Sequence, residues 1–229
     1  VISSISGNET WVYDITTKEW HQRASLTVTS SIVDVLSDTF AGTAASVVGH
    51  VPELVSSGSW AASGAVAQLV LDGSGNLNPG ALSIDYAAVL SISPADNYAK
   101  GIVYAMSAFI AVTTSGQVLS RISGLGIDAI ELVLEASGGA LQARAIVRDN
   151  TNTPTTFATV TGLGVGTRLL KMDILYRTAK FYVDGVLKQT LTLPSETNDV
   201  VDSVYAFARG DNAPTTNYGI ASLVAQRYS

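Results

Sequence analysis

The chain has 229 residues, of which 47% are apolar and 14% are charged; its formal net charge is −6 and it contains no cysteine. A nucleic-acid-binding protein normally presents a basic face, so this acidic balance argues against nucleic acid as a partner. The absence of cysteine excludes disulfides and thiolate metal sites, and no apolar run approaches the ~20 residues with which a helix crosses a bilayer. Small, β-branched and hydroxyl-bearing residues predominate, which favours an extracellular or virion protein made of strands and turns.

Residues 1–30 are expected to form a separate N-terminal arm. Residues 10–14 and 20–23 have the composition of two strands joined by a turn, which predicts a β-hairpin. The pattern W-V-Y-D-x-x-T-x-x-W in this segment resembles one hairpin of a kelch-type propeller blade, and also segments of phage head-closure and tail hub proteins. A propeller needs several such repeats, so the segment is either part of a propeller outside this chain or a lone hairpin. Because aromatic side chains are favoured as interface anchors, we predict a subunit contact through Trp11, Tyr13 and Trp20.

Residues 31–229 are expected to form a second domain built of short strands. Apolar or alternating runs recur along this segment, and clusters of Gly, Asn, Asp or Pro separate them, which is typical of two packed antiparallel sheets. Residues 127–136 have a pattern compatible with helix or strand, and the Gly138-Gly139 turn that follows favours a hairpin. The other expected strands lie at residues 65–71, 82–92, 101–112, 117–121, 141–148, 157–160, 202–209 and 218–224.

The alternation is clearest between Leu169 and Leu193, where apolar residues recur with the period of a strand. A polar break at residues 177–180 is expected to separate the first strand from the second. Asp184-Gly185 predicts a tight hairpin turn, because both residues tolerate a positive φ. The stretch therefore predicts a three-stranded meander with one buried face, on which the first strand places Leu170, Met172, Ile174 and Tyr176.

Two patches of sequence resemble a known family. The string LLKMDILY followed by FYVDGVLKQTLTL resembles the core of the concanavalin A/laminin G-like sandwiches. Asp38-Thr39-Phe40, followed by residues 49–53 and Trp60, resembles the opening of laminin G-like modules in phage tail proteins and bacterial surface proteins. The resemblance implies an all-β antiparallel sandwich, a concanavalin A-like jelly roll, over residues 31–229, preceded by the β-hairpin arm.

The resemblance also implies a function. We predict a non-enzymatic structural module of a phage virion, in a decoration, tail or fibre protein. Its partners would be other virion proteins, further copies of the chain and host surface glycan, with no nucleic acid or membrane among them. The alternative is an extracellular carbohydrate-binding or carbohydrate-active domain of glucanase-like fold. Loop aromatics are the expected sugar contacts, although Trp60 also stands where the family buries an aromatic: Trp60, Tyr98 and Tyr218.

Glu131 and Glu135 are the candidates for catalysis. Some glucanases of this fold carry a strand of the type E-x-D-x-E, and retaining hydrolysis uses two carboxyl groups ~5–5.5 Å apart. Here Val133 replaces the central Asp, so we predict two solvated glutamates and no enzyme. His21 and His50 lack partners at a recognisable spacing for a nucleophile triad, and the glycine-rich segment at residues 162–166 lacks the Lys-Ser/Thr of a phosphate-binding loop.

Calcium is left open as a cofactor. A hard cation needs about six to eight oxygen ligands, and no spaced carboxylate loop motif is present, so no metal ligand is assigned. Loop oxygens of the right type belong to Asp72, Asn76, Asp96, Asn97, Asp149, Asp211 and Asn212.

Overall fold

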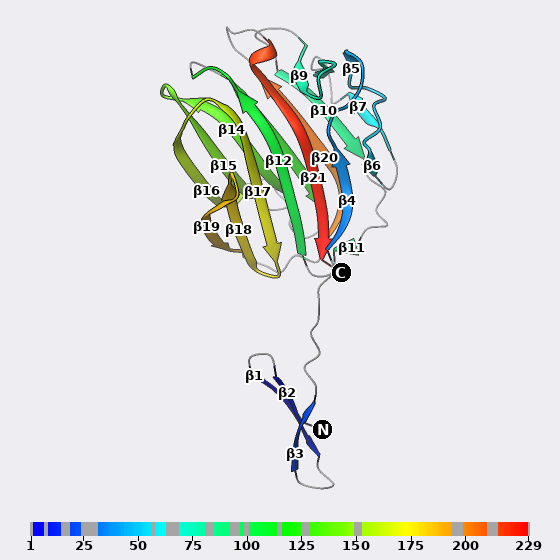
Figure 1. Cartoon of the computed structure of the whole chain (residues 1–229), viewed down its shortest axis with the longest axis vertical. Coiled ribbons are helices and arrows are strands. Elements are labelled where there is room, and N and C mark those ends of the chain that lie inside the picture. The colour runs from blue at the N-terminus through cyan, green and yellow to red at the C-terminus, as the bar shows by residue number, and fades with distance from the viewer. Residues whose placement is uncertain are drawn as a thin grey trace. The chain divides into compact units, whose positions relative to one another are not determined.

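A computed structural model shows how the chain is organised (Figure 1). It describes residues 2–6, 9–14, 19–23, 32–55, 58–62, 69–80, 85–91, 97–98, 101–113, 116–124, 129–148, 153–193, 199–209 and 215–228. The chain divides into two compact units, Val1–Ser31 and Ile32–Ser229. None of the described residues belongs to a helix with the length and hydropathy of a membrane span.

The first unit is a three-stranded antiparallel sheet in the order β1-β2-β3. Its strands are β1 (Ile2–Ser6), β2 (Glu9–Asp14) and β3 (Glu19–Arg23). The pair β2–β3 is the expected hairpin, and β1 adds a strand that the sequence pattern did not indicate. Tyr13 is the register partner of Trp20, and Trp11 pairs with Gln22. The side chains of this unit lie outside the described part of the structure.

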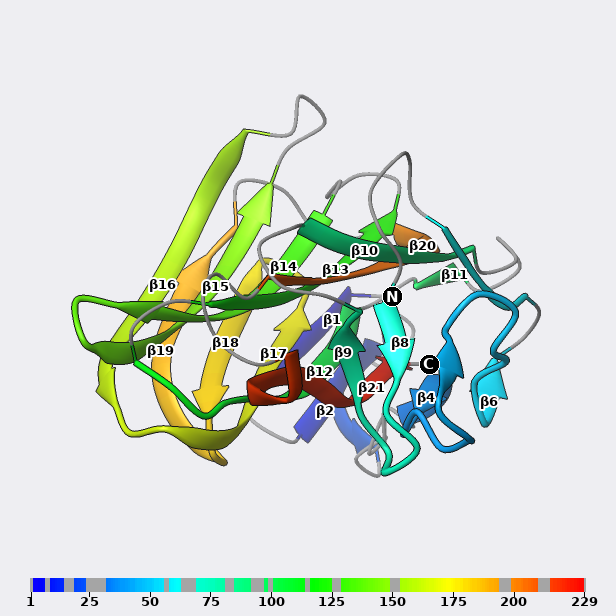
Figure 2. The ribbon, with the colours of Figure 1, turned by 90° about the horizontal axis from the view of Figure 1, so that it is seen from above.

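The second unit consists of two antiparallel sheets packed as two layers (Figure 2). The first, an eight-stranded sheet, contains β16 (Pro154–Leu163), β15 (Ala140–Arg148), β14 (Ala129–Ser137), β13 (Gln117–Gly124), β20 (Asp199–Arg209), β10 (Asp85–Ser91), β7 (Trp60–Ala62) and β11 (Asn97–Tyr98). The second, a ten-stranded sheet, contains β19 (Val186–Thr192), β18 (Thr178–Val183), β17 (Gly166–Leu175), β12 (Gly101–Ile110), β21 (Tyr218–Tyr228), β9 (Leu77–Pro79), β8 (Leu69–Leu71), β5 (Ala45–Ser46), β4 (Ile32–Asp38) and β6 (Leu54–Val55). A 3-10 turn, η1 (Thr215–Asn217), precedes β21. The predicted all-β antiparallel sandwich is confirmed.

Strand alternation builds the core between the two layers. From β14, Leu132 and Leu134 are fully buried in the common core, and from β12, Tyr104 and Met106 join them. Burying a side chain of this size stabilises the fold by about 1.5–3 kcal/mol. Because successive residues of a strand point to opposite faces, the intervening residues of β14, among them Glu131, lie on the outer face of the eight-stranded sheet. The hairpin interpretation of this segment is therefore right.

The meander differs from expectation at its first turn. The Asp184-Gly185 turn is confirmed, with φ of 52° and 76° at its two residues. The first turn lies at Tyr176-Arg177, because Leu175 already pairs with Thr178 across β17 and β18. Tyr176 is 52% exposed with φ of 53°, so the prediction that it lies on the buried face is wrong.

Candidate functional site

Residues of the family-like opening patch form a buried structural contact. Asp38, at the end of β4, is fully buried. Its Oδ1 accepts hydrogen bonds from the backbone N–H of Phe40 at 2.8 Å and from Nε2 of His50 at 3.1 Å, and its Oδ2 accepts one from Nε1 of Trp60 at 2.7 Å. Each donor would cost about 1–3 kcal/mol if it were buried without a partner. The Asp38 carboxylate therefore links β4, the loop at His50 and β7 through hydrogen bonds.

The predicted sugar-stacking aromatics are not gathered into a site. Trp60 is 1% exposed and is held by Asp38, so the prediction that it contacts glycan is wrong, and its alternative placement as a buried aromatic holds. Tyr218 is also fully buried, and a Cβ added to Gly116 would overlap its ring, so the prediction of an exposed loop aromatic is wrong for this residue too. Tyr98 lies on β11, and its side chain is outside the described part of the structure.

The outer face of the eight-stranded sheet carries a network of charged side chains centred on Glu131 and Glu135. Glu131 Oε1 accepts hydrogen bonds from Nε of Arg121 at 2.7 Å and from its Nη2, and Oε2 accepts one from Nη2 of Arg148 at 2.9 Å. Glu131 is consequently 2% exposed, although it points away from the core. The prediction that Glu131 is a solvated glutamate is therefore wrong.

Glu135 is held in the same way two positions further along its face. Its Oε2 accepts hydrogen bonds from Nε2 of Gln117 at 2.9 Å and from Nη2 of Arg144 at 3.0 Å. Its Oε1 accepts one from Nε2 of Gln142 and lies 2.8 Å from Nε of Arg144. Such charge-assisted, bidentate contacts fix both partners in one geometry.

Aromatic side chains flank this network along a continuous cross-strand row. Register pairs connect Tyr205 on β20 to Arg121, Glu131 to Ile146 on β15, and Ile146 to Phe157 on β16. The Arg121 guanidinium carbon lies 5.9 Å from the centre of the Tyr205 ring, and Phe157 is 63% exposed. We call this surface the arginine–glutamate face and define it as Gln117, Arg121, Glu131, Glu135, Gln142, Arg144, Ile146, Arg148, Phe157 and Tyr205.

The chemistry of the face is that of a fixed hydrogen-bonding surface. Retaining glycoside hydrolysis requires one of its two carboxyl groups to donate a proton to the leaving oxygen. Both glutamates here accept from arginines, and Val133, 1% exposed, stands between them. Their oxygens serve to orient the guanidinium and amide groups of this face, and the side chains of Arg121 and Arg144 remain 29% and 31% exposed.

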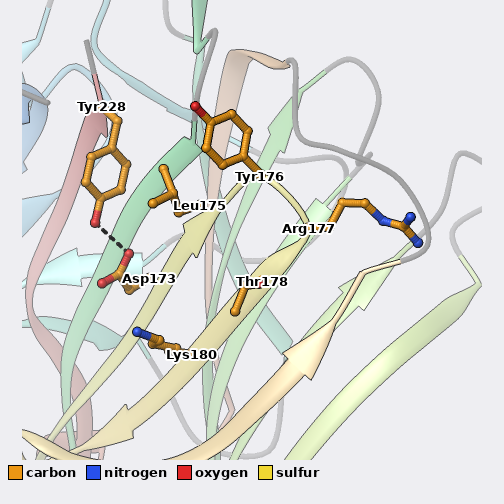
Figure 3. A pocket seen from close by; sticks show the side chains of 7 residues that line it. All are labelled: Asp173, Leu175, Tyr176, Arg177, Thr178, Lys180 and Tyr228. Carbon is orange, nitrogen blue, oxygen red and sulfur yellow. Dashed lines mark hydrogen bonds between the residues drawn. The ribbon is translucent and has the colours of Figure 1, made fainter. Parts of the chain in front are cut away.

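The ten-stranded sheet has a pocket of about 500 Å³ on its outer face, which we call the Tyr176 pocket (Figure 3). It lies at the β17–β18 turn and the end of β21, and its lining residues are Asp173, Leu175, Tyr176, Arg177, Thr178, Lys180 and Tyr228. Figure 3 shows the Tyr228 phenol directed at Asp173 and the Arg177 guanidinium directed away from it. The phenol donates a hydrogen bond to Asp173 Oδ1 at 2.7 Å.

The strands beside this pocket approach each other closely. A Cβ at Gly101, on β12, would collide with the carbonyl of Ile174, so the approach of β12 to β17 requires glycine here. Burial, and then the hydrogen bond to the Asp173 carboxylate and its charge, raise the pKa of Tyr228 to about 12. The phenol is therefore a fixed donor at neutral pH. No local sequence pattern indicated this site, because its residues come from β17, β18 and the final strand.

No group of three or more His, Cys, Asp or Glu within the described ranges is placed to hold a metal ion. Of the loops that hold calcium candidates, the one at Asp72 and Asn76 is described, and the Asp72 carboxylate is already hydrogen-bonded within that loop. Burial opposes ionisation of Asp72, but hydrogen bonds from Nδ2 of Asn76 and from the backbone N–H groups of Ser74 and Asn76 outweigh it and lower the pKa of Asp72. The remaining candidates lie outside the described residues, except that the backbone of Asn97 belongs to β11.

No family model matches the sequence, and no curated protein matches it. The sandwich is similar to solved structures. The CBM2 module, a carbohydrate-binding module, of the evolved Dit of Lactobacillus casei BL23 phage J-1 has a TM-score of 0.58 at 13% identity, over 86% of this chain and 96% of that one. The ligand-binding domain of botulinum neurotoxin serotype D, solved in complex with N-acetylneuraminic acid, has a TM-score of 0.53 at 10% identity, over 86% and 48%. Porphyranase B from Zobellia galactanivorans has a TM-score of 0.50 at 12% identity, over 86% and 93%.

At these identities the likeness concerns the fold, and it agrees with the concanavalin A-like β-sandwich that the sequence resemblance implied. It also requires a correction. The presence of Val133 in place of the central Asp of the E-x-D-x-E pattern predicted that the chain is not an enzyme, yet porphyranase B, an enzyme by its name, has a similar sandwich. The prediction that the chain is not an enzyme is therefore wrong as an exclusion, because an enzyme is among the proteins with a similar sandwich.

Proposed function

We propose that the chain binds carbohydrate on the arginine–glutamate face. The observation that carries the proposal is the cross-strand row in which Tyr205, the Arg121–Glu131 ion pair and the exposed Phe157 follow one another from β20 to β16, with Ile146 between Glu131 and Phe157. Sugars combine hydroxyl groups with apolar C–H faces, and their sites combine a few placed polar groups with apolar or aromatic walls. This row supplies both.

Preorganisation supports the proposal. Each glutamate of the face is held by at least two side chains, so the polar groups need little ordering when a ligand arrives. Binding then loses less side-chain entropy, at about 0.5–1.5 kcal/mol for each long side chain that is already immobilised. The carbohydrate-binding module of the phage Dit and the sialic-acid complex of the neurotoxin domain have the same fold, which also supports a glycan ligand.

A titration with a panel of soluble polysaccharides, read by calorimetry, tests the proposal. Phe157→Ala removes an exposed ring without opening the core, and we expect it to weaken binding about tenfold, or ~1.4 kcal/mol. Leu187→Ala, which truncates another exposed apolar side chain on β19, is the matched control and should leave affinity unchanged. Absence of saturable binding across the panel, or equal affinity of the two variants, would overturn the proposal.

The same titration should be followed for products. Release of reducing ends that disappears in both Glu131→Gln and Glu135→Gln would show that the bound glycan is also cleaved. Binding without product release would place the function in recognition. Either outcome requires the glycan to lie across β13, β14 and β15. An arginine-specific reagent checks that placement, because the bound polysaccharide should protect Arg121 and Arg144 from modification.

We further propose that the chain acts in a phage virion, where the second unit binds glycan and the first unit contacts virion subunits. The similarity to a module of a phage Dit supports this setting. The subunit contact is assigned to Trp11, Tyr13 and Trp20 of the first unit. Immunogold labelling of intact particles with antibodies to residues 32–229 tests the location, and unlabelled particles would contradict it. Sedimentation of a Trp11→Ser/Trp20→Ser variant tests the contact, and an unchanged mass distribution would contradict it.

A further inference from the structure

We propose that the Tyr176 pocket is a second binding site, independent of the arginine–glutamate face, and that it takes a sugar bearing a carboxylate. The pocket has a volume of about 500 Å³, within the range of about 300–1,000 Å³ that is typical of small-molecule sites. A single pyranose with its substituents fits such a volume.

One cation of the lining is available to an anionic ligand. The pocket contains one carboxylate, Asp173, and one cation that reaches it, Lys180. The Arg177 guanidinium is directed away, and its Nε donates a hydrogen bond to the carbonyl oxygen of Leu193 at 3.1 Å. Asp173 and Lys180 are register partners on β17 and β18, and yet no ion pair joins them within the described structure. Lys180 is exposed and makes no hydrogen bond or ion pair to any described residue. Its ammonium is thus available to a ligand carboxylate.

The polar groups beside Lys180 suit hydroxyl groups. Tyr228 occupies Oδ1 of Asp173 and holds that carboxylate in place, while Oδ2 has no hydrogen-bond donor from the described residues. A carboxylate oxygen accepts up to two hydrogen bonds, so Oδ2 can receive neighbouring hydroxyls of one sugar ring. The Thr178 hydroxyl also lines the pocket. Asp173 therefore recognises the ring, and Lys180 recognises its acid substituent.

Tyr176 supplies the aromatic wall at a conformational cost. It stands in the left-handed region, with φ of 53°, at the first position of a two-residue hairpin turn, and its side chain is 52% exposed. Glycine, asparagine or aspartate normally takes this position. The other hairpin of the meander obeys that rule with Asp184-Gly185. Tyr176 is half exposed and is not part of the buried core, and strain of this kind concentrates at functional sites.

The test is a titration of the full chain with D-glucuronate, followed by NMR or calorimetry, with D-glucose and acetate as comparison ligands. We expect saturable binding of glucuronate, at least tenfold weaker binding of glucose, and no saturable binding of acetate. Lys180→Met should reduce the affinity for glucuronate to that for glucose. Lys188→Met, which removes an exposed lysine of β19 outside the pocket, is the matched control and should bind as the unaltered chain does.

Tyr176→Gly provides a second readout, because it should abolish glucuronate binding while the melting temperature rises by about 2–4 °C. Loss of binding caused by misfolding would lower the melting temperature instead. Three results would overturn the inference: equal affinity for glucuronate and glucose, displacement of bound glucuronate by acetate but not by glucose, or unchanged affinity for glucuronate in Lys180→Met. If Arg144→Ala abolishes glucuronate binding and Lys180→Met does not, the ligand lies on the arginine–glutamate face, so this inference fails and the proposed function stands.

Discussion

The two outer faces of the sandwich carry similar side chains but satisfy them differently. On the eight-stranded sheet, all four oxygens of Glu131 and Glu135 accept hydrogen bonds from arginine or glutamine. On the ten-stranded sheet, Asp173 accepts one hydrogen bond from the described side chains, that of Tyr228, and its register partner Lys180 is left without an ion pair. The first face is a closed network, whereas the second has hydrogen-bonding capacity to spare.

The comparison shows that exposure to the outside does not by itself measure availability. Glu131 points away from the core and is 2% exposed, because two arginines cover it. The polar groups of the Glu131–Glu135 network therefore contribute more to the free energy of unfolding and to the geometry of their sheet than the polar groups of the pocket do. The closed network can bind a ligand through its exposed rings and arginine side chains. The open one can bind a ligand directly through the Asp173 carboxylate and the Lys180 ammonium.

Breaking the closed network should have the largest effect. Glu131→Ala leaves Arg121 and Arg148, whose side chains are 29% and 20% exposed, beside each other without their counter-charge. A hydrogen bond to a charged group contributes about 1.5–3 kcal/mol, so losing the contacts to both arginines should cost about 3–5 kcal/mol. We expect the melting temperature to fall by about 6–12 °C or more, measured by calorimetry. Asp173→Ala in the pocket is the control for the open network and should cost less than about 1 kcal/mol. Equal losses in the two variants would contradict the distinction.

The two hairpin turns of the meander give the next effect, of opposite sign. Tyr176→Gly removes the strain of a left-handed tyrosine and should stabilise the fold by about 1 kcal/mol. Asp184→Gly should not stabilise it, although Asp184 has nearly the same φ of 52°. The Asp184 carboxylate accepts a hydrogen bond from the backbone N–H of Leu169 at 2.9 Å and one from Arg168 at 3.1 Å, and the variant loses both. Denaturant unfolding of the two variants measures the difference.

The Tyr228–Asp173 contact makes stability depend on pH in the alkaline range. The folded-state pKa of Tyr228 is raised to about 12, above the ordinary value of about 10. The folded state therefore retains a proton that the unfolded state loses, so this contribution is complete below pH ~10 and declines as the pH rises towards 12. Absorbance of the phenolate should show that Tyr228 titrates late, as does Tyr104, whose burial also raises its pKa. Asp173→Asn should lower the pKa of Tyr228 and leave that of Tyr104 unchanged. An unchanged titration in that variant would contradict the contact.

The smallest effect is expected at Lys180. Because Lys180 is exposed and makes no hydrogen bond or ion pair with a described residue, Lys180→Met should change the free energy of unfolding by no more than about 0.5 kcal/mol. A larger decrease in the free energy of unfolding, measured by urea unfolding, would show that the lysine stabilises the sheet and is not available to a ligand. The variant is therefore suited to binding experiments, since its fold should be intact.

Much of the fold could be read from local pattern. The alternation of β17 and β18 and the Asp184-Gly185 turn were predicted correctly. Alternating burial and positive-φ turns depend on the types of neighbouring residues, so the local sequence is enough to predict them. The first turn of the meander was misplaced, since Tyr176 continues the apolar alternation of β17 in sequence but stands in the turn in space. The functional part of the prediction fared less well. Trp60 and Tyr218 are buried, although both lie among loop and strand-end residues.

The sequence alone determined that this chain is an antiparallel sandwich with a glutamate pair on one strand face, because strand period and turn chemistry are local properties. The tertiary structure decided what those glutamates contact. Arg121 and Arg148 reach Glu131 from the strands on either side of it, and Tyr228 reaches Asp173 across 55 positions of the chain and over an intervening strand. Such contacts depend on which strands become neighbours, and that order is set by packing of the whole core.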